Sequence, residues 1–359
     1  MRSVVVSAAV AMFLAAPARA EYAESAFFAK SIPAYSIPTP PKKGPAPDTV
    51  IGQVRAYRIR KGDTLIDLAR YYDIGYNEIV EANPGIDPWL PPAGATILLP
   101  TEWVLPCCSY DGLVVNIPEM RLFFFKRSAK DSNTTIVYTY PVGLGRDDWQ
   151  TPTGKFRVRG KTVNPQWNIP ESIRKEHIAE RGDPRTFIPG GAPDNPLGKY
   201  RIELTLPLYG IHGTDIPWGV GMQVSHGCVR LYPEDIERLF PLVPNGAPGE
   251  FVYQPVKVGM RGGTVYAEMQ KDIYGYAPAI YREATIAVER AKLADRVEQS
   301  RLLTVLEDGG AGMPVQVSPD ASEGGGELVP ATARTPEPAP GETTGDRAPH
   351  PDDDETGDD

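Results

Sequence analysis

One cysteine with two nearby histidines is the group of residues in this chain best suited to chemistry. Of the four histidines, His212 and His226 lie within sixteen residues of Cys228. A thiol attacks as the thiolate, so it needs a base within hydrogen-bond reach, a partner that orients the base, and backbone amides facing the developing oxyanion. The stretches His212-Gly213 and Ser225-His226-Gly227-Cys228 contain residue types suited to these roles. We therefore predict nucleophilic catalysis by Cys228, with His212 as its base.

Two other interpretations of these residues stay open. Two histidines and one cysteine could bind zinc with a water as fourth ligand, although their spacing lacks the regularity of usual zinc sites. A buried structural cysteine beside core histidines is the second alternative. Acyl transfer to a thiol needs no cofactor, so we predict neither a metal nor an organic cofactor.

The residues around Cys228 resemble the L,D-transpeptidase catalytic domain, also called the YkuD domain, of the ErfK/YbiS type. The family pattern is a His-Gly pair, a gap in the mid-teens, then Ser-His-Gly-Cys, an apolar residue and Arg or Asn, and this chain matches at each position up to Arg230. Residues 116–122, 151–154 and 194–198 also look like the family. The resemblance covers about residues 102–300 and implies a mainly β catalytic domain: a YkuD-like β-sandwich with a helix and a long lid loop.

That resemblance implies a peptidoglycan tetrapeptide stem as the acyl donor. Cys228 would attack the carbonyl of the diaminopimelate residue and expel the terminal D-alanine. His212 would be the general base, oriented by the backbone carbonyl of Gly213. His226 would support the thiolate, and the amides of Gly227 and Cys228 would form the oxyanion hole.

Four more residues are expected to contact substrate: Tyr209, Trp167, Ser225 and Arg230. Arg230 would position its loop or a stem carboxylate, or else form an ion pair with Glu234 or Asp235. Trp167 lies in the proline-rich stretch 161–198, which we predict to be the lid, and it could equally anchor that loop.

The acceptor of the acyl group is not encoded in any readable motif. A diaminopimelate amine of another stem, a lysine of an outer-membrane protein or lipoprotein, and water all use the same thiol and base. A carboxypeptidase or endopeptidase, and a wall-binding scaffold without catalysis, are the alternative functions.

Residues 51–101 are predicted to form a small α+β module. Apolar spacing gives a strand near Tyr57, a helix after Thr64, a short helix over 77–81 and a return strand over 97–99. The turn from Gly62 to Leu65 and the pair Asn83-Pro84 resemble the LysM carbohydrate-binding module. This resemblance implies binding to glycan containing N-acetylglucosamine; a folded spacer is the alternative.

The remaining segments are assigned by composition. Residues 1–20 combine Arg2, a short apolar run and a small-x-small site at Ala18 to Ala20, which predicts a cleaved signal peptide and a periplasmic location, with a retained membrane anchor as the alternative. Residues 21–50 are expected to be a proline-rich linker, 102–254 the catalytic domain, 255–306 a partly helical extension and 307–359 a disordered acidic tail.

Charge separates the tail from the rest. The net charge is −9, and residues 307–359 hold fourteen acidic residues against two arginines, so the body of the protein is close to neutral. A near-neutral body argues against nucleic acid as a partner. Peptidoglycan is the partner that the two resemblances imply. Three cysteines leave at least one free thiol; the adjacent Cys107 and Cys108 could form a vicinal bridge, pair with another chain or stay reduced.

Overall fold

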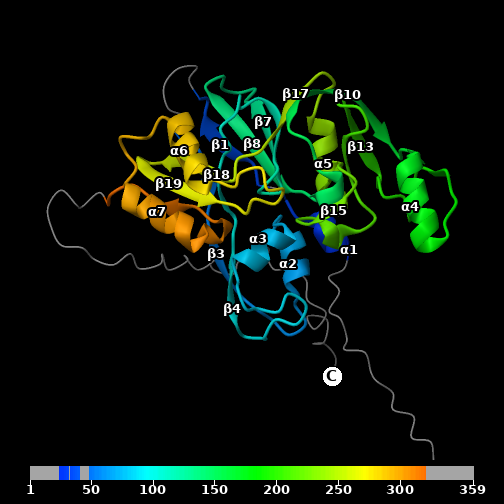
Figure 1. The fold of residues 1–359 in the computed structure, drawn as a ribbon, viewed down its shortest axis with the longest axis horizontal. Coiled ribbons are helices and arrows are strands. Elements are labelled where there is room, and N and C mark those ends of the chain that lie inside the picture. The colour runs from blue at the N-terminus through cyan, green and yellow to red at the C-terminus, as the bar shows by residue number, and fades with distance from the viewer. Residues whose placement is uncertain (1–23, 32, 41–47, 321–359) are drawn as a thin grey trace, which may run out of the picture.

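The computed structural model of this chain describes residues 24–31, 33–40 and 48–320. The predictions for the signal peptide, and for the acidic tail beyond residue 320, concern residues outside these ranges. Figure 1 shows a central sheet with three attachments: a small module below it, a unit containing α6 and α7 on one side, and α4 at the far end of the other side. No helix in the described part of the chain is long and apolar enough to cross a membrane.

A nine-stranded sheet forms the centre of the protein. Neighbouring strands pair antiparallel, except that β6 with β17 and β14 with β16 are parallel. Along the sheet the order is β1 (Tyr35–Pro38), β8 (Thr134–Pro141), β7 (Arg121–Arg127), β6 (Gly112–Asn116), β17 (Pro248–Val252), β10 (Gly154–Val163), β13 (Tyr200–Leu204), β14 (Gly210–His212) and β16 (Val229–Arg230).

Alternate residues of these strands build the main core. Leu113, Phe156, Ile202 and Ile211 are among its members and are almost completely buried. Helix α5 (Pro233–Leu242) covers this core with residues such as Ile236, and it begins with proline at its first turn, where a missing N–H costs no hydrogen bond. The mainly β class predicted for the catalytic domain is confirmed.

The segment before residue 50 is not only a linker, so that prediction is wrong for its described residues. Helix α1 (Glu24–Ala29) inserts Phe27 into the core of the small module, and β1 pairs with β8 over four residues. A strand containing Pro38 is compatible with this place because β1 is at the edge of the sheet, where one side needs no ladder donors.

The small module has the predicted order of strand, helix, helix, strand: β3 (Arg55–Arg58), α2 (Leu65–Tyr71), α3 (Tyr76–Glu81) and β4 (Thr96–Leu99). Thr64 caps α2 by accepting a hydrogen bond from the Asp67 amide. The side chain of Asn83 donates to the carbonyls of Ile79 and Leu98 and accepts from the Leu98 amide, which fixes the end of α3 against β4.

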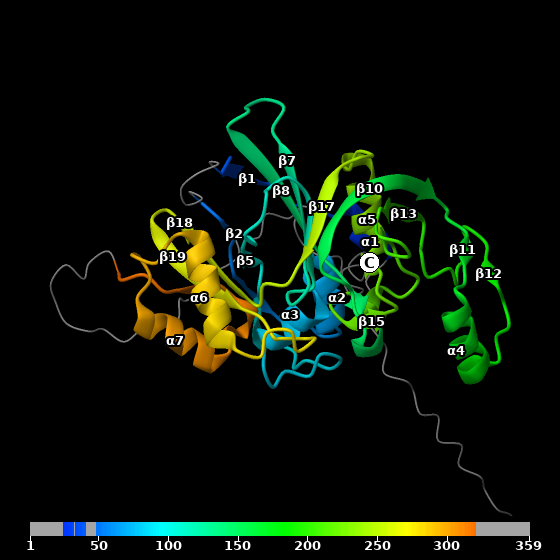
Figure 2. The same cartoon turned by 45° about the horizontal axis from the view of Figure 1, so that its top comes forward.

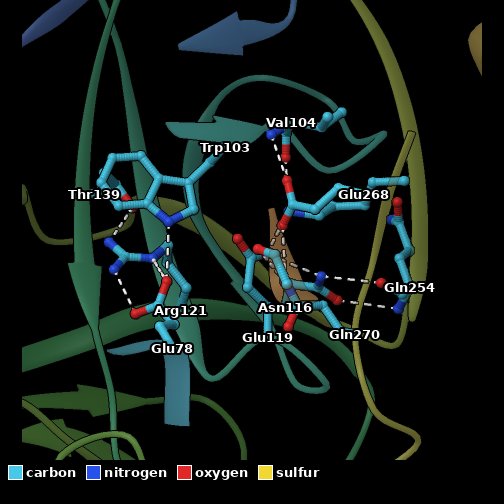
Figure 3. A network of polar contacts seen from close by, with 12 residues as sticks. Glu78, Trp103, Val104, Asn116, Glu119, Arg121, Thr139, Gln254, Glu268 and Gln270 are labelled. Atoms are coloured by element: carbon cyan, nitrogen blue, oxygen red, sulfur yellow. Dashed lines mark hydrogen bonds and ion pairs between the residues drawn. The ribbon is translucent and has the colours of Figure 1, made fainter. Parts of the chain in front are cut away.

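Buried polar contacts fix this module to the catalytic domain (Figure 3). The guanidinium of Arg121, on β7, is fully buried and donates to both carboxylate oxygens of Glu78 on α3, at 2.9 and 2.7 Å. It also stacks on the ring of Trp103, whose Nε1 donates to the same carboxylate. A buried charged pair that is fully hydrogen-bonded favours one relative position of the residues that it joins, here α3 and β7.

A second buried group joins the catalytic domain to the C-terminal residues. The ammonium of Lys257 lies 2.7 Å from Glu119 and 2.8 Å from Glu268, and donates to the carbonyl of Val104 in β5 (Glu102–Val104). β5 pairs with β2 (Val50–Gly52), next to the module. Burial raises the pKa of Glu119 to about 7, with a further contribution from the nearby charge of Glu268, while Lys257 acts in the opposite direction.

The C-terminal residues form a folded unit with its own core. A hairpin of β18 (Val256–Arg261) and β19 (Thr264–Met269) turns at Gly262-Gly263, both with positive φ, and pairs with β20 (Val315–Gln316). Helices α6 (Ile280–Ala291) and α7 (Gln299–Asp308) pack on it. The partly helical extension is therefore larger than predicted: the tail boundary at 307 is wrong, because the described fold continues to residue 320.

The predicted lid loop contains regular structure. Strands β11 (Trp167–Asn168) and β12 (Phe187–Ile188) form a short ladder, and α4 (Glu171–Arg181) lies between them. Figure 2 shows this insertion, residues 161–198, extending from the ends of β10 and β13.

Candidate active site

Strand register brings the predicted nucleophile and base to one face of the sheet. Ile202, Ile211 and Val229 are level with one another on β13, β14 and β16 and face the core. Side chains alternate along a strand, so His212 and its neighbours face the other way. β14 and β16 are parallel, with Ile211 opposite Val229, so the residues before them, Gly210 and Cys228, are also level. Gly210 lies two residues before His212 on the same strand, so Cys228 and His212 are on the same face of the sheet.

His212 is buried and fixed in one orientation. Its side chain is almost completely enclosed, with 2% of the residue exposed, and Nδ1 lies 2.7 Å from the carbonyl oxygen of Gly213. A proton on Nδ1 satisfies that carbonyl and leaves Nε2 as the acceptor, which is the tautomer a general base needs. Burial, assisted by the charge of Arg230, lowers the pKa of His212 to about 3, so the ring is neutral at neutral pH.

Cys228 is a free, partly exposed thiol. Its Sγ lies 3.5 Å from the carbonyl oxygen of Leu208, a residue held at φ +70°. Burial raises the pKa of the Cys228 thiol, while a hydrogen bond from the backbone of Gly210 and the charge of Arg201 act in the opposite direction. In the resting site the thiol and the imidazole are therefore both neutral.

Ser225 holds the turn that carries Cys228. Its hydroxyl donates to the Cys228 carbonyl at 2.6 Å and accepts the Gly227 amide at 3.1 Å. The Gly227 amide, predicted to donate to the oxyanion, thus has a partner in Ser225, and the Ser225 hydroxyl stabilises the turn from inside the protein. Glycine is required at 227, because φ is +99° and a Cβ atom would lie 2.7 Å from the ring of Tyr209. Tyr209 thus packs directly over the turn beside the thiol.

Thr151 and Tyr274 support this turn from behind through hydrogen bonds that we did not predict from the sequence. The hydroxyl of Thr151 donates to the Gly227 carbonyl and accepts the Gly145 amide, both at 3.0 Å. Tyr274, which follows β19, accepts the Thr151 amide at 3.2 Å and donates to the Gly145 carbonyl. Thr151 lies in a stretch already matched to the family, so a signal for it existed, whereas nothing in the sequence around Tyr274 indicated this contact.

His226 points toward α4 and not toward the thiol. Its Nε2 lies 2.9 Å from Glu176, which also pairs with Arg146 at 2.7 Å, and its ring meets Trp149 edge to face. Hydrogen bonds to His226 and Arg146 lower the pKa of Glu176, so it stays a carboxylate. The predicted support of the thiolate by His226 is therefore not seen in this geometry.

The described residues do not provide a set of zinc ligands. Within residues 24–31, 33–40 and 48–320, no three His, Cys, Asp or Glu side chains are grouped so that they could hold a metal ion. The Nδ1 of His212 faces a backbone carbonyl and the Nε2 of His226 faces a carboxylate.

Trp167 was predicted either to contact substrate or to anchor the insertion. Trp167 packs on the small cluster of Ile169, Ile173 and Ile188, with its ring 5.8 Å from that of His177, which favours the role of anchor of the insertion.

Arg230 does not pair with Glu234 or Asp235. Glu234 is occupied by Arg70 of the small module, and Asp235 lies 3.8 Å from Arg238. The ion-pair interpretation of Arg230 is therefore wrong, and its guanidinium stays on the face that carries His212.

Comparison with known proteins identifies the family of this chain. The L,D-transpeptidase catalytic domain family matches residues 111–258, and the LysM domain family matches residues 57–100. The chain belongs to the YkuD family of L,D-transpeptidases and carries a LysM domain.

Its relatives include several enterobacterial proteins. "Probable L,D-transpeptidase YbiS" of Escherichia coli is 36% identical over 62% of this chain and 72% of its own. "Probable L,D-transpeptidase ErfK/SrfK" of Salmonella typhimurium is 32% identical over 79% of this chain and 92% of its own. A solved L,D-transpeptidase from Mycobacterium smegmatis is 18% identical over 44% of this chain and 63% of its own, with a TM-score of 0.30, too low for a comparison of the folds.

Proposed function

We propose that Cys228 catalyses acyl transfer from a peptidoglycan tetrapeptide stem. Nε2 of His212 takes the thiol proton while Sγ attacks the carbonyl of the diaminopimelate residue. The tetrahedral intermediate collapses, the C–N bond to D-alanine breaks, and His212 returns its proton to the leaving amine. The product is a thioester on Cys228 and free D-alanine.

The observation that carries this proposal is the arrangement of His212. It is buried, neutral and held through Nδ1 by a carbonyl, on the same sheet face as a thiol two register positions away. A neutral pair lets the proton move during attack, without a thiolate stored beforehand. The amide of Cys228, which takes no part in the Ser225 contact, is the oxyanion donor we propose.

In the second half-reaction an amine attacks the thioester and regenerates the thiol. The proposed acceptor is the diaminopimelate amine of another stem, which gives a crosslink, or a lysine of an outer-membrane protein. We place the enzyme in the periplasm, exported by the predicted signal peptide.

The LysM module would keep the catalytic domain on its polymer. Its loop between α3 and β4 exposes Trp89 by 46% and Leu90 by 72%, an apolar surface suited to stacking on sugar rings. Retention of the full chain on purified sacculi tests this binding, and Trp89→Ala is expected to reduce it.

Two measurements test the proposed function. Intact mass after incubation with a carbapenem is expected to show one adduct on the wild type and none on Cys228→Ala. Product analysis with muropeptides then separates the functions: new or more dimers indicate transfer, tripeptides alone indicate a carboxypeptidase, and loss of dimers an endopeptidase. A folded protein that forms no adduct would contradict catalysis and favour a wall-binding scaffold.

A further inference from the structure

Two arginines lie on either side of the strand that carries His212. Arg201 on β13 and Arg230 on β16 are both level with His212, one strand away in opposite directions. All three side chains therefore start on the same face of the sheet, away from the core. Adjacent strands are about 4.8 Å apart, so the two guanidinium groups can both reach the space above Cys228.

Neither guanidinium has a protein partner among the described residues. Their Nε atoms are buried without any hydrogen-bond partner, and neither side chain forms an ion pair within 4.0 Å. Asp215 acts on Arg230 from a greater distance, and its own buried Oδ1 is also unpartnered. Burying such donors without acceptors is unfavourable, which points to an anionic ligand that completes them.

Other arginines on the same face behave differently. Arg159 pairs with Glu203 at 3.1 Å, and Arg157 donates to the Gly246 carbonyl at 3.0 Å. On this face of the sheet, Arg201 and Arg230 therefore differ from Arg157 and Arg159, which both have protein partners.

Gly210 makes room for Arg201 to approach the thiol. A Cβ atom at this position would lie 3.2 Å from Nε of Arg201, which shows that the side chain folds over β14 at Gly210. Gly210 is level with Cys228 on the next strand. The positive charge of Arg201 thus lies beside the position that the attacked carbonyl must occupy.

We infer that Arg201 and Arg230 form a carboxylate-binding site beside Cys228, and that its ligand is the terminal carboxylate of the residue displaced from the donor. This inference rests on the proposed acyl transfer. That carboxylate is one residue, about 3.8 Å, beyond the attacked carbonyl, so it falls where guanidinium groups flanking the thiol can bind it. It would also offset the positive charge near His212, which helps this ring accept the thiol proton.

Three donor peptides test the assignment. The first is a tetrapeptide stem with a free terminal carboxylate, the second has this carboxylate amidated, and the third has only the diaminopimelate side-chain carboxylate amidated. The kcat/KM of Cys228 acylation is measured for the wild type, Arg201→Gln, Arg201→Lys and the control Arg159→Gln.

The wild type is expected to prefer the free acid over the terminal amide by at least about tenfold. Arg201→Gln should reduce this ratio several-fold, because it slows acylation by the acid more than acylation by the amide. Arg201→Lys should keep part of the ratio, and Arg159→Gln should keep all of it. Equal rates for acid and amide in the wild type, an equal loss on both peptides in Arg201→Gln, or sensitivity to the side-chain amide alone would each overturn the inference. If Arg201→Gln does not fold, the ratio of kcat/KM for the acid to kcat/KM for the terminal amide is measured on Arg201→Lys, and an unchanged ratio there would overturn the inference. A wild type that is acylated by none of the peptides would refute the proposed function itself.

Discussion

The Nε2 atom of His226 lies 2.9 Å from the carboxylate of Glu176, on α4. The histidine next to the nucleophile turn is therefore a contact between that turn and the insertion 161–198. Arg146 holds the same carboxylate from the other side, at 2.7 Å. Both contacts are partly exposed, so they can open and close without a large cost in free energy.

Replacing Glu176 by Gln is expected to loosen α4. The variant loses the charge that Arg146 and His226 share, so hydrogen exchange of the α4 amides should accelerate several-fold while the central sheet is unchanged. Glu171→Gln is the matched control, because Glu171 lies on the same helix and, among the described residues, forms its ion pairs within that helix, with Arg174 and Lys175. Equal acceleration in both variants would contradict the contact with the nucleophile turn.

The buried state of His212 predicts an acid-sensitive fold. Its pKa is about 3 in the native protein and 6.5 as a free side chain, so between these values the unfolded state binds a proton that the native state does not. Its contribution to stability is complete above pH 6.5 and falls as the pH drops toward 3, by up to about 1.4 kcal/mol per pH unit. His212→Asn should show a shallower fall in unfolding free energy between pH 6.5 and 4.5. Parallel curves for the two proteins would contradict a neutral buried ring.

Thr151→Val is expected to slow acylation of Cys228 by about ten- to a hundredfold. Valine keeps the shape of the threonine side chain, but the Gly145 amide and the Gly227 carbonyl each lose a buried hydrogen-bond partner. This loss costs about 1–3 kcal/mol, and we expect it to displace the nucleophile turn. Thr153→Val, at an exposed position of the same loop, is the control. Single-turnover acylation with a carbapenem measures both; unchanged rates in Thr151→Val would remove this residue from the support of the site.

Lys257→Met is expected to lower the free energy of unfolding by about 3–5 kcal/mol. The change leaves Glu119 and Glu268 buried with no cation, and breaking such a group is far costlier than losing a surface pair. Lys271→Met removes an ion pair to Glu81 whose lysine side chain is 73% exposed, and should cost less than about 1 kcal/mol. Denaturant midpoints compare the two, and similar values would contradict the structural importance of the buried group.

The sequence was informative where local pattern decides structure. The small module was predicted in order because its caps and apolar spacing lie within fifty residues. Cys228, His212 and Gly213 could be proposed from the sequence because glycines and histidines beside a cysteine are rare in combination and stand out in the chain. The contact between His212 Nδ1 and the Gly213 carbonyl lies where the resemblance placed it.

Contacts made by the fold could not be predicted in the same way. Arg201 and Glu176 reach the site from β13 and α4, and no local pattern distinguishes them from other surface charges. The proline-rich residues before 50 concealed an edge strand, because prolines are tolerated there. The direction of His226 depends on its packing against Trp149, which sequence spacing does not specify.

The proposed acyl transfer requires a thioester at Cys228. The decisive measurement is intact mass of the wild type, Cys228→Ala and His212→Ala after rapid mixing with a tetrapeptide stem, together with the amount of D-alanine released. We predict one tripeptide adduct per wild-type chain with one equivalent of D-alanine, none on Cys228→Ala, and formation slowed by several orders of magnitude in His212→Ala. D-alanine release by Cys228→Ala at the wild-type rate, or a loss of less than about tenfold in His212→Ala, would contradict the roles given to these two residues.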